Sequence, residues 1–455
     1  HGEYGRELPS LNPGRPKECG LEQLTGRHLP EDWRGTFITN DFRANRVTRY
    51  RVSRYESGYR SEFLGDMVSS SHRAFRPVDV KMGPDGAIYI VDWYNMIIDH
   101  GEVDFHHKLR DKGHGRIWRL SVKDSSLLPP PQIVDAEVSE LLDALRSPEQ
   151  WTRNQARRRL CESGPQVVLP ALQNWLSNTA SDTDRLRALW VCQGLRSVDG
   201  SLLNQCLTAE DERIRAAAVR VLSDWHSQLE PGMLWFTRAV QDSHPQVRLE
   251  AVNALREVGN RQAVEIAMQA ADWPLDQNLD FALWRTARML QQHWLPAFQQ
   301  GEEVFGGVPA RLAFALAATN NRDSLSGLAR LVETEGLDLD QRINAMKVLA
   351  SLGTVEHRAL VLERLADFEE SNRLAVLAAL LESERQAPAN ADRLVEMLNA
   401  QNRGVQNAVV RLAGHWQLAK AYEPISQILT QEGAPYDARL AAARSLAAIN
   451  PEQAR

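Results

Sequence analysis

A pattern of the form R-x-x-A-x-x-x-L recurs every 30 to 33 residues through the second part of the chain. Such a unit has room for two helices of about 12 residues and their turns. The alanines let one helix approach its neighbour closely, and units that contact only the next unit stack into a superhelix. We therefore predict an α-solenoid of about ten HEAT-like repeats. The register positions are Arg153, Arg185, Arg215, Arg248, Phe281, Arg311, Arg342, Arg373, Gln406 and Arg439.

The first 124 residues follow a different pattern, which predicts β structure. Short alternating or β-branched segments are separated there by glycine, proline and aspartate. Asp85 and Gly86 form a turn signal between two of these segments, because glycine adopts the positive φ that a tight hairpin requires. The candidate strands are 35–40, 46–52, 62–68, 78–82, 87–92 and 116–122.

An internal repeat within this β region indicates propeller blades. The segments GTFITNDF (35–42) and RVTRYRV (46–52) match GAIYIVDW (86–93) and RIWRLSV (116–122). The second copy carries a 19-residue insertion near 95–113. One blade of antiparallel strands takes roughly 40–50 residues, so about two blades fit in this region.

The sequence thus predicts a mixed fold of two domains. A partial β-propeller formed by the last blades is expected over residues 1–124, a Pro-rich linker over 125–131 and the α-solenoid over 132–455. Because a propeller closes with ~4–8 blades, we expect the remaining blades to belong to a longer protein. The first residue, His1, is not methionine and agrees with a chain that is a piece of such a protein.

Composition excludes some partners and sites. The chain has 53 basic and 59 acidic residues, with a net charge of -6, so it has no general attraction to nucleic acid. No apolar run reaches the ~18 residues of a membrane span. Four cysteines occur without a CxxC spacing, which excludes a zinc ribbon and a c-type haem attachment site within this stretch.

The insertion between the last two predicted strands is the densest cluster of ionisable side chains. In an extended segment, residues two apart lie on one side, and imidazole and carboxylate groups bind transition metals. The candidate ligands are His100, Glu102, Asp104 and His106. The alternative is a solvated polar loop packed on a blade, and neighbouring lysine and arginine side chains would oppose a cation.

Asp41 and Asp92 occupy equivalent positions at the ends of two repeated strands. In a structural role, each carboxylate caps the turn that follows it. In a functional role, the strand ends face a central channel, where a carboxylate beside aromatic rings contacts a planar cofactor or a sugar. The channel or ligand candidates are Arg76, Asp79, Asp92, Trp93, Tyr94 and Asn95.

The recurrent arginine of the solenoid also has two interpretations. It forms a ladder with acids of adjacent repeats, such as Asp211 or Asp340, or it forms a basic stripe that binds an acidic partner. The excess of acidic over basic side chains after residue 124 favours the ladder. We find no GxSxG, HExxH, P-loop, GxGxxG or EF-hand string.

Four strings of the β region resemble one propeller family. They are LTGRHLPEDWRG (24–35), NDFRANR (40–46), FRPVDVKMGPDGAIYIVDWYN (75–95) and DKGHGRIWR (111–119). They are similar to the last blades of large membrane-bound dehydrogenase-like proteins, also known as haem-binding CxxCH proteins. That propeller is related to those of sorbosone dehydrogenase and soluble quinoprotein glucose dehydrogenase, and HEAT repeats and a cytochrome c domain follow it.

The resemblance implies an exported, periplasmic or cell-envelope protein that oxidises a sugar or alcohol and passes electrons to haem c. It also implies a quinone cofactor or calcium on the propeller. The chain departs from the family pattern because it has no CxxCH, so a haem would attach outside this chain. The fragment alone is then expected to be inactive.

A hypothesis from another class is a propeller and HEAT scaffold that binds proteins or glycans without catalysis. The absence of catalytic strings favours it. In either case a partial ring exposes strand edges and apolar faces. We therefore expect residues 1–122 either to pack on the first helical repeats near Trp151 and Trp175 or to be poorly ordered before about Trp33.

Overall fold

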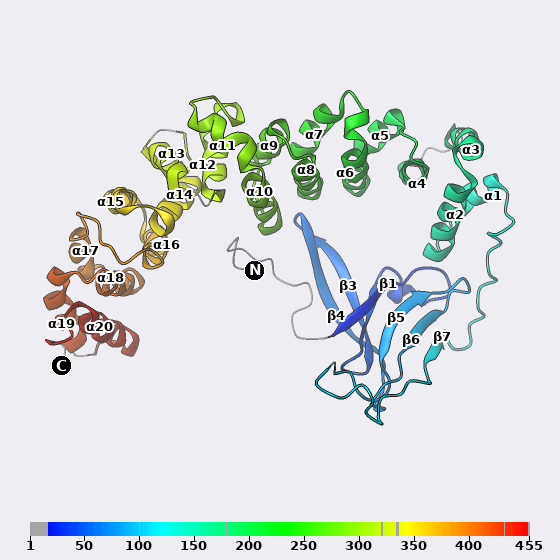
Figure 1. Cartoon of the computed structure of the whole chain (residues 1–455), viewed down its shortest axis with the longest axis horizontal. Coiled ribbons are helices and arrows are strands. Elements are labelled where there is room, and N and C mark those ends of the chain that lie inside the picture. The colour runs from blue at the N-terminus through cyan, green and yellow to red at the C-terminus, as the bar shows by residue number, and fades with distance from the viewer. Residues whose placement is uncertain are drawn as a thin grey trace. The chain divides into compact units, whose positions relative to one another are not determined.

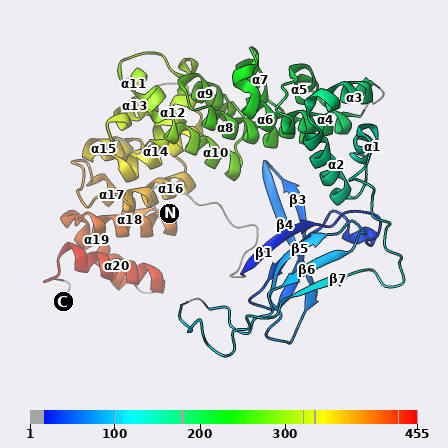
Figure 2. The same cartoon turned by 45° about the vertical axis from the view of Figure 1, so that its right-hand side comes forward.

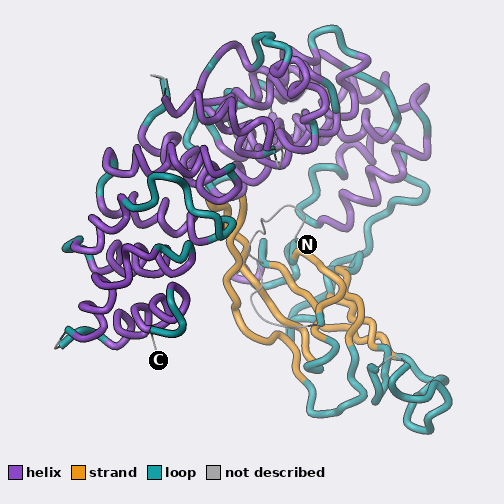
Figure 3. Tube along the Cα trace, turned by 60° about the vertical axis from the view of Figure 1, so that its left-hand side comes forward, coloured by secondary structure: helices purple, strands orange, loops and turns teal. Residues whose placement is uncertain are grey.

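The computed structural model describes residues 17–99, 101–177, 181–319, 322–333, 336–431 and 433–453. Strands lie in the N-terminal part of the described chain and helices fill the rest (Figure 3). Contacts divide the chain into two compact units, His1–Ala254 with Asp276–Phe281 and Leu255–Leu275 with Ala282–Arg455. The domain boundary expected at 125–131 lies between the last strand and the first helix, and it stays a prediction.

The strands form two antiparallel sheets in which chain order equals spatial order (Figure 1). The six predicted strands are confirmed as β2 to β7. The first sheet contains β1 (Glu18–Gln23), β2 (Phe37–Asp41), β3 (Arg46–Tyr55) and β4 (Gly58–Ser69), and the second contains β5 (Pro77–Met82), β6 (Ile88–Asp92) and β7 (Arg116–Leu120).

Strand β1 is the one that the sequence did not predict. Its pairing with β2 shifts register between Cys19 and Leu21, where Gly20 has a φ of 66°. A β-bulge at glycine interrupts the alternation on which strand prediction depends. Thus the strand carries no period-2 signal.

The internal repeat is visible in the pairing of the strands. The pair β2 and β3 ends with Asp41 opposite Arg46, and the pair β6 and β7 ends with Asp92 opposite Arg116. The insertion lies between β6 and β7. Over the described residues, the two sheets do not close into a ring. Their common core consists of Leu24, Leu29, Ile38, Val47, Val80, Met82, Ile88 and Ile90.

The predicted repeat register is confirmed by the helices. Each register position lies in an even-numbered helix, near its first turn. These helices are α2 (Gln150–Ser163), α4 (Asp182–Gly194), α6 (Glu212–Trp225), α8 (Pro245–Val258), α10 (Gln277–Met289), α12 (Pro309–Ala318), α14 (Leu339–Leu352), α16 (Glu370–Leu381), α18 (Arg403–His415) and α20 (Tyr436–Ile449).

The odd-numbered helices form the second layer of the solenoid. Within each compact unit, even-numbered helices stack on one another and odd-numbered helices cover their other side (Figure 2). The odd-numbered helices are α1 (Val138–Ala144), α3 (Pro165–Ser177), α5 (Gly200–Leu207), α7 (Gly232–Val240), α9 (Arg261–Ala267), α11 (Gln291–Gln299), α13 (Arg322–Glu333), α15 (Val355–Arg364), α17 (Arg393–Glu396) and α19 (Tyr422–Thr430). In the part of the chain that the structure describes, no helix has the length and apolar character needed to cross a bilayer.

The ladder predicted for the register arginines is found in part: Arg215 pairs with Asp242 of the next repeat, and Arg311 pairs with Asp272 of the preceding one. Arg153, Arg215 and Arg248 each donate from Nη1 to two carbonyl oxygens five and six residues upstream, at 2.7–3.1 Å. Side chains on a helix point toward its N-terminus, so these guanidinium groups reach the loop before the helix. Of the acids named for the ladder, Asp211 pairs with Arg213 of its own repeat.

Candidate functional site

The predicted ligand residue Asp92 ends β6 with a fully buried side chain. Its Oδ1 accepts hydrogen bonds from the backbone amides of Arg76 (2.8 Å) and Tyr94 (2.9 Å). Its Oδ2 accepts one from Trp118 Nε1 (3.0 Å) and lies 3.5 Å from Arg116 Nε. Both oxygens therefore accept hydrogen bonds from within the chain. The carboxylate caps the turn after β6, which is the structural role that we considered for Asp92.

Arg76 is also buried, and it ties the two sheets together. Its guanidinium group donates to the carbonyl oxygens of Asn95 (2.9 Å), Phe42 (2.8 Å) and Arg43 (3.2 Å). Burial lowers the pKa of Arg76. Asp79, predicted beside it, has other contacts: its Oδ1 accepts from Lys81 Nζ at 3.0 Å and from the Val80 amide at 2.9 Å.

The accessible part of this region is aromatic and cationic. Tyr94 has a φ of 54°, stacks on His72 at a centroid distance of 5.8 Å and lies 3.7 Å from the Arg116 guanidinium. Trp93 is 42% exposed and lines a shallow hollow with Val78, Val91, Asp92, His114, Gly115, Arg116 and Ile117. Rings beside a guanidinium group can bind a planar or anionic group. The sequence did not indicate His72 or Arg116, since each meets Tyr94 only in the fold.

The predicted metal ligands lie in the loop between β6 and β7. His100 lies outside the described residues, and Glu102, Asp104 and His106 are exposed. Asp104 Oδ1 accepts from the His106 amide at 2.8 Å, so this carboxylate caps a local turn. Across the described ranges, no group of three or more His, Cys, Asp or Glu side chains is placed to hold a metal ion. With His100 undescribed, the metal site stays a prediction.

Asn95, the last residue predicted with Asp92, holds the start of this loop. Its side chain is buried. Nδ2 donates to the Asp111 carbonyl (3.1 Å), and Oδ1 accepts from the Ile97 amide (3.1 Å). Asn95 therefore joins the beginning of the insertion to its end and fixes the base of the loop.

The four cysteines are free, and their surroundings oppose thiolate formation. Burial, followed by the charge of Asp79, raises the pKa of Cys19 to about 11. Burial raises the pKa of both Cys192 and Cys206 to about 12, and it raises that of Cys161 as well. Since the thiolate is the reactive form, none of the four is an activated nucleophile at neutral pH.

We expect the folded protein at pH 8 to react with iodoacetamide at least about tenfold more slowly than the urea-unfolded chain, because burial restricts access and keeps the thiols protonated. Mass spectrometry of each cysteine peptide measures the rates. A cysteine that reacts as fast in the folded as in the unfolded chain would contradict this expectation and identify an activated thiol.

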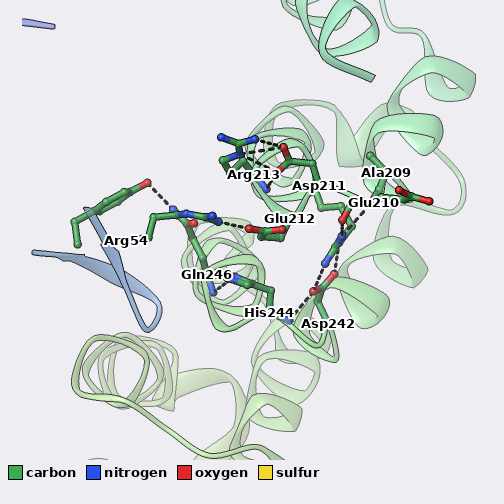
Figure 4. Close-up of polar contacts among 11 residues, drawn as sticks. Arg54, Ala209, Glu210, Asp211, Glu212, Arg213, Asp242, His244 and Gln246 are labelled. Atoms are coloured by element: carbon green, nitrogen blue, oxygen red, sulfur yellow. Dashed lines mark hydrogen bonds and ion pairs between the residues drawn. The ribbon is translucent and has the colours of Figure 1, made fainter. Parts of the chain in front are cut away.

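A long hairpin formed by β3 and β4 reaches the N-terminal ends of three even-numbered helices. Ser57, in its turn, donates from its amide to Asp276 Oδ2 (3.0 Å) and from Oγ to Asp276 Oδ1 (2.6 Å). Tyr59 accepts from Gln246 Nε2 of α8, and Arg54 pairs with Glu212 of α6 (Figure 4). We call these six residues the hairpin lock.

The lock uses helix ends that already favour hydrogen-bonding side chains. Asp276 Oδ1 also accepts from the amides of Asn278 (3.0 Å) and Leu279 (3.1 Å), so the same carboxylate caps α10. Glu212 lies in the first turn of α6, where the helix dipole favours an anion, and its hydrogen bond from Arg54 lowers its pKa. The lock therefore stabilises helix ends and hairpin together.

Two further sets of contacts join the β region to helices of the same compact unit. A Cβ atom on Gly58 would lie 2.4 Å from Asn278 Nδ2, so the hairpin turn approaches α10 closely. At the first repeats, Arg27 pairs with Glu149 (2.9 Å), and Thr25 Oγ1 accepts from the Gln150 amide (3.1 Å). The β region therefore contacts the first helical repeat directly before Trp151, as expected, whereas the contacts of the hairpin lock were not predicted.

Comparison with known proteins identifies the repeat type. A family model described as HEAT repeats matches residues 200–279, which confirms HEAT-type repeats there. A model described as a domain of unknown function (DUF7133) matches residues 16–124. No curated protein sequence matches the chain. These findings give no support to the dehydrogenase resemblance.

Similar solved structures include an engineered protein, with 17% identity, a TM-score of 0.29 and coverage of 69% of this chain and 98% of that one. Kap121p bound to Pho4p has 12% identity, a TM-score of 0.41 and coverage of 70% and 42%. Human deoxyhypusine hydroxylase in complex with glycerol has 17% identity, a TM-score of 0.25 and coverage of 69% and 96%. The chain spans under half of Kap121p, and at these TM-scores no conclusion about partners or activity follows.

Proposed function

We propose that this chain is a protein-binding scaffold in which the solenoid carries the β region. The hairpin lock is the observation that carries this proposal. It connects the β region to three successive repeats through side chains that are occupied with one another. Such a connection holds the exposed surfaces of one unit in a fixed arrangement, as a scaffold requires. The side chains that form it bond to one another and are not placed to act on a substrate.

The chemistry of the candidate residues also favours a scaffold. Asp92 and Arg76 are buried, and their polar atoms bond to this chain. The thiols are held protonated by burial. The groups that remain accessible near Asp92 are rings and a guanidinium group, which suit binding.

Crosslinking of the full chain in an extract of its source cells, followed by mass spectrometry, tests this proposal. We expect reproducible crosslinks to a small set of proteins, concentrated on the even-numbered helices. An unrelated HEAT solenoid of similar charge serves as the control bait. The scaffold function is rejected if the two baits capture the same proteins.

We keep the oxidoreductase hypothesis and the propeller interpretation as a second, separate proposal. The meander order of both sheets supports the interpretation of the β region as two blades. Haem c, a quinone cofactor or calcium, a sugar or alcohol substrate, and a periplasmic location rest on the family resemblance. Upstream blades, a signal peptide and a downstream CxxCH in the full reading frame, together with dye reduction by that protein, would support them.

A further inference from the structure

The even-numbered helices of the last three repeats border a groove of about 710 Å³. Its polar rim carries Arg385, Arg411 and Arg444, together with His415 and a single carboxylate, Asp437. Leu381, Leu440, Ala441 and Ala448 supply apolar lining. The repeats from 370 to 449 contain equal numbers of acidic and basic residues. The excess of arginine is therefore a local property of the groove.

The three guanidinium groups have no carboxylate partner within the described residues. The ion pairs of these repeats join other side chains, as between Lys420 and Asp392. Asp437, the acid of the groove, accepts from Asn407 Nδ2 at 3.2 Å. Three guanidinium groups beside one carboxylate leave the groove with a net positive charge, which favours an anionic ligand.

The groove is also preorganised. His415 Nε2 donates to the Ser383 carbonyl (2.9 Å), Trp416 Nε1 to the Glu384 carbonyl (3.3 Å) and Arg358 to the Gln386 carbonyl (3.1 Å). These bonds fix the loop that carries Arg385. A loop that is already ordered loses less entropy when a ligand binds.

Arg411 and Arg444 occupy the same position in consecutive repeats, five residues beyond the register positions. Neighbouring packed helices lie about 8–10 Å apart. A peptide in the extended polyproline II conformation rises about 3.1 Å per residue with three residues per turn, so every third side chain lies on the same side, about 9 Å apart. A peptide that crosses these two helices therefore places acidic side chains three residues apart beside Arg411 and Arg444.

We propose that this groove binds an extended acidic segment of a partner protein, with Asp or Glu at every third residue. The arginines pair with the carboxylates, and the leucine and alanine side chains contact the residues between them. This inference rests on the proposed scaffold function and specifies the chemistry of one partner. A polypeptide fits better than a nucleic acid, because the groove offers apolar lining and no Phe, Tyr or Trp side chain among those that border it.

Fluorescence anisotropy with the full chain and a labelled peptide of repeated Glu-Ala-Ser units tests the proposal. We expect saturable binding that weakens with added salt, and no binding of the matched Gln-Ala-Ser peptide. The double variant R411E/R444E is expected to bind the Glu peptide at least about tenfold more weakly. A Lys-Ala-Ser peptide should bind this variant better than the wild type.

The matched control is R330E/R393E, which makes the same change of charge on α13 and α17, in the other layer. It should bind the Glu peptide as the wild type does, and circular dichroism checks the folding of both variants. An equal loss in both variants, equal binding of the Gln peptide or tighter binding of a single-stranded oligonucleotide would overturn the proposal. If R411E/R444E keeps every crosslinked partner while the peptide fails to bind, the groove is wrong and the scaffold function stands. If the crosslinking bait captures nothing specific, the scaffold function fails regardless of the peptide.

Discussion

Replacement of Asp92 with alanine is expected to destabilise the β region by about 3 kcal/mol, because a buried donor that loses its acceptor costs about 1–3 kcal/mol. The amides of Arg76 and Tyr94 lose their acceptor in this variant, and Trp118 Nε1 loses its own. Asp92→Asn retains the volume but presents an amide donor where an acceptor is needed. We expect a loss about half as large.

Hydrogen exchange of the β6 and β7 amides measures this effect, since a loss of 3 kcal/mol of local stability raises opening by roughly two orders of magnitude. Asp79→Ala is the matched control, because that carboxylate is half-exposed and bonds to Lys81 and its own neighbouring amide. This variant should change the free energy of local opening, as measured by exchange, by less than about 1 kcal/mol. Equal effects of the two variants would contradict a structural role of Asp92 and restore it as a ligand candidate.

The repetitive features of this fold could be predicted because they are local. The helix positions follow from a period of 30 to 33 residues, and strands β2 to β7 follow from alternation and turn residues such as Gly86. The register arginine was assigned only one of its two kinds of acceptor, since a period identifies a recurrent side chain without showing every group that it meets. Its other acceptors are carbonyl oxygens of the preceding loop, which every residue has.

The contacts that build the candidate sites could not be predicted, because they join distant segments. Ser57 and Asp276 lie 219 residues apart, and neither carries a motif. The groove could not be predicted for a related reason: Arg385 follows α16, whereas Arg411 and Arg444 come from two later helices. One signal was available for the hairpin, since the segment between the predicted strands 46–52 and 62–68 contains a single glycine and continues the strand pattern on both sides.

Replacement of Asp276 with alanine is expected to release the hairpin from the solenoid. The variant loses the cap of α10, worth about 1 kcal/mol, and two hydrogen bonds from Ser57, worth about 1 kcal/mol each. We therefore expect a loss of about 2–3 kcal/mol. Hydrogen exchange should become faster at the hairpin tip, residues 53–60, as well as in the first turn of α10.

Asp199→Ala separates the two parts of this effect. Asp199 caps α5 through the Leu202 amide at 2.9 Å, and among the described residues no hydrogen bond joins it to the hairpin, so its loss removes a cap alone. It should cost about 1 kcal/mol and leave exchange at 53–60 unchanged. Ser57→Ala should raise exchange at the hairpin tip while α10 stays capped, and its effect should be smaller in the Asp276→Ala background because the two residues share one interaction. Additive effects of these two substitutions would show that the hairpin and the helix end are energetically independent, and the proposed scaffold would then lose the connection on which it rests.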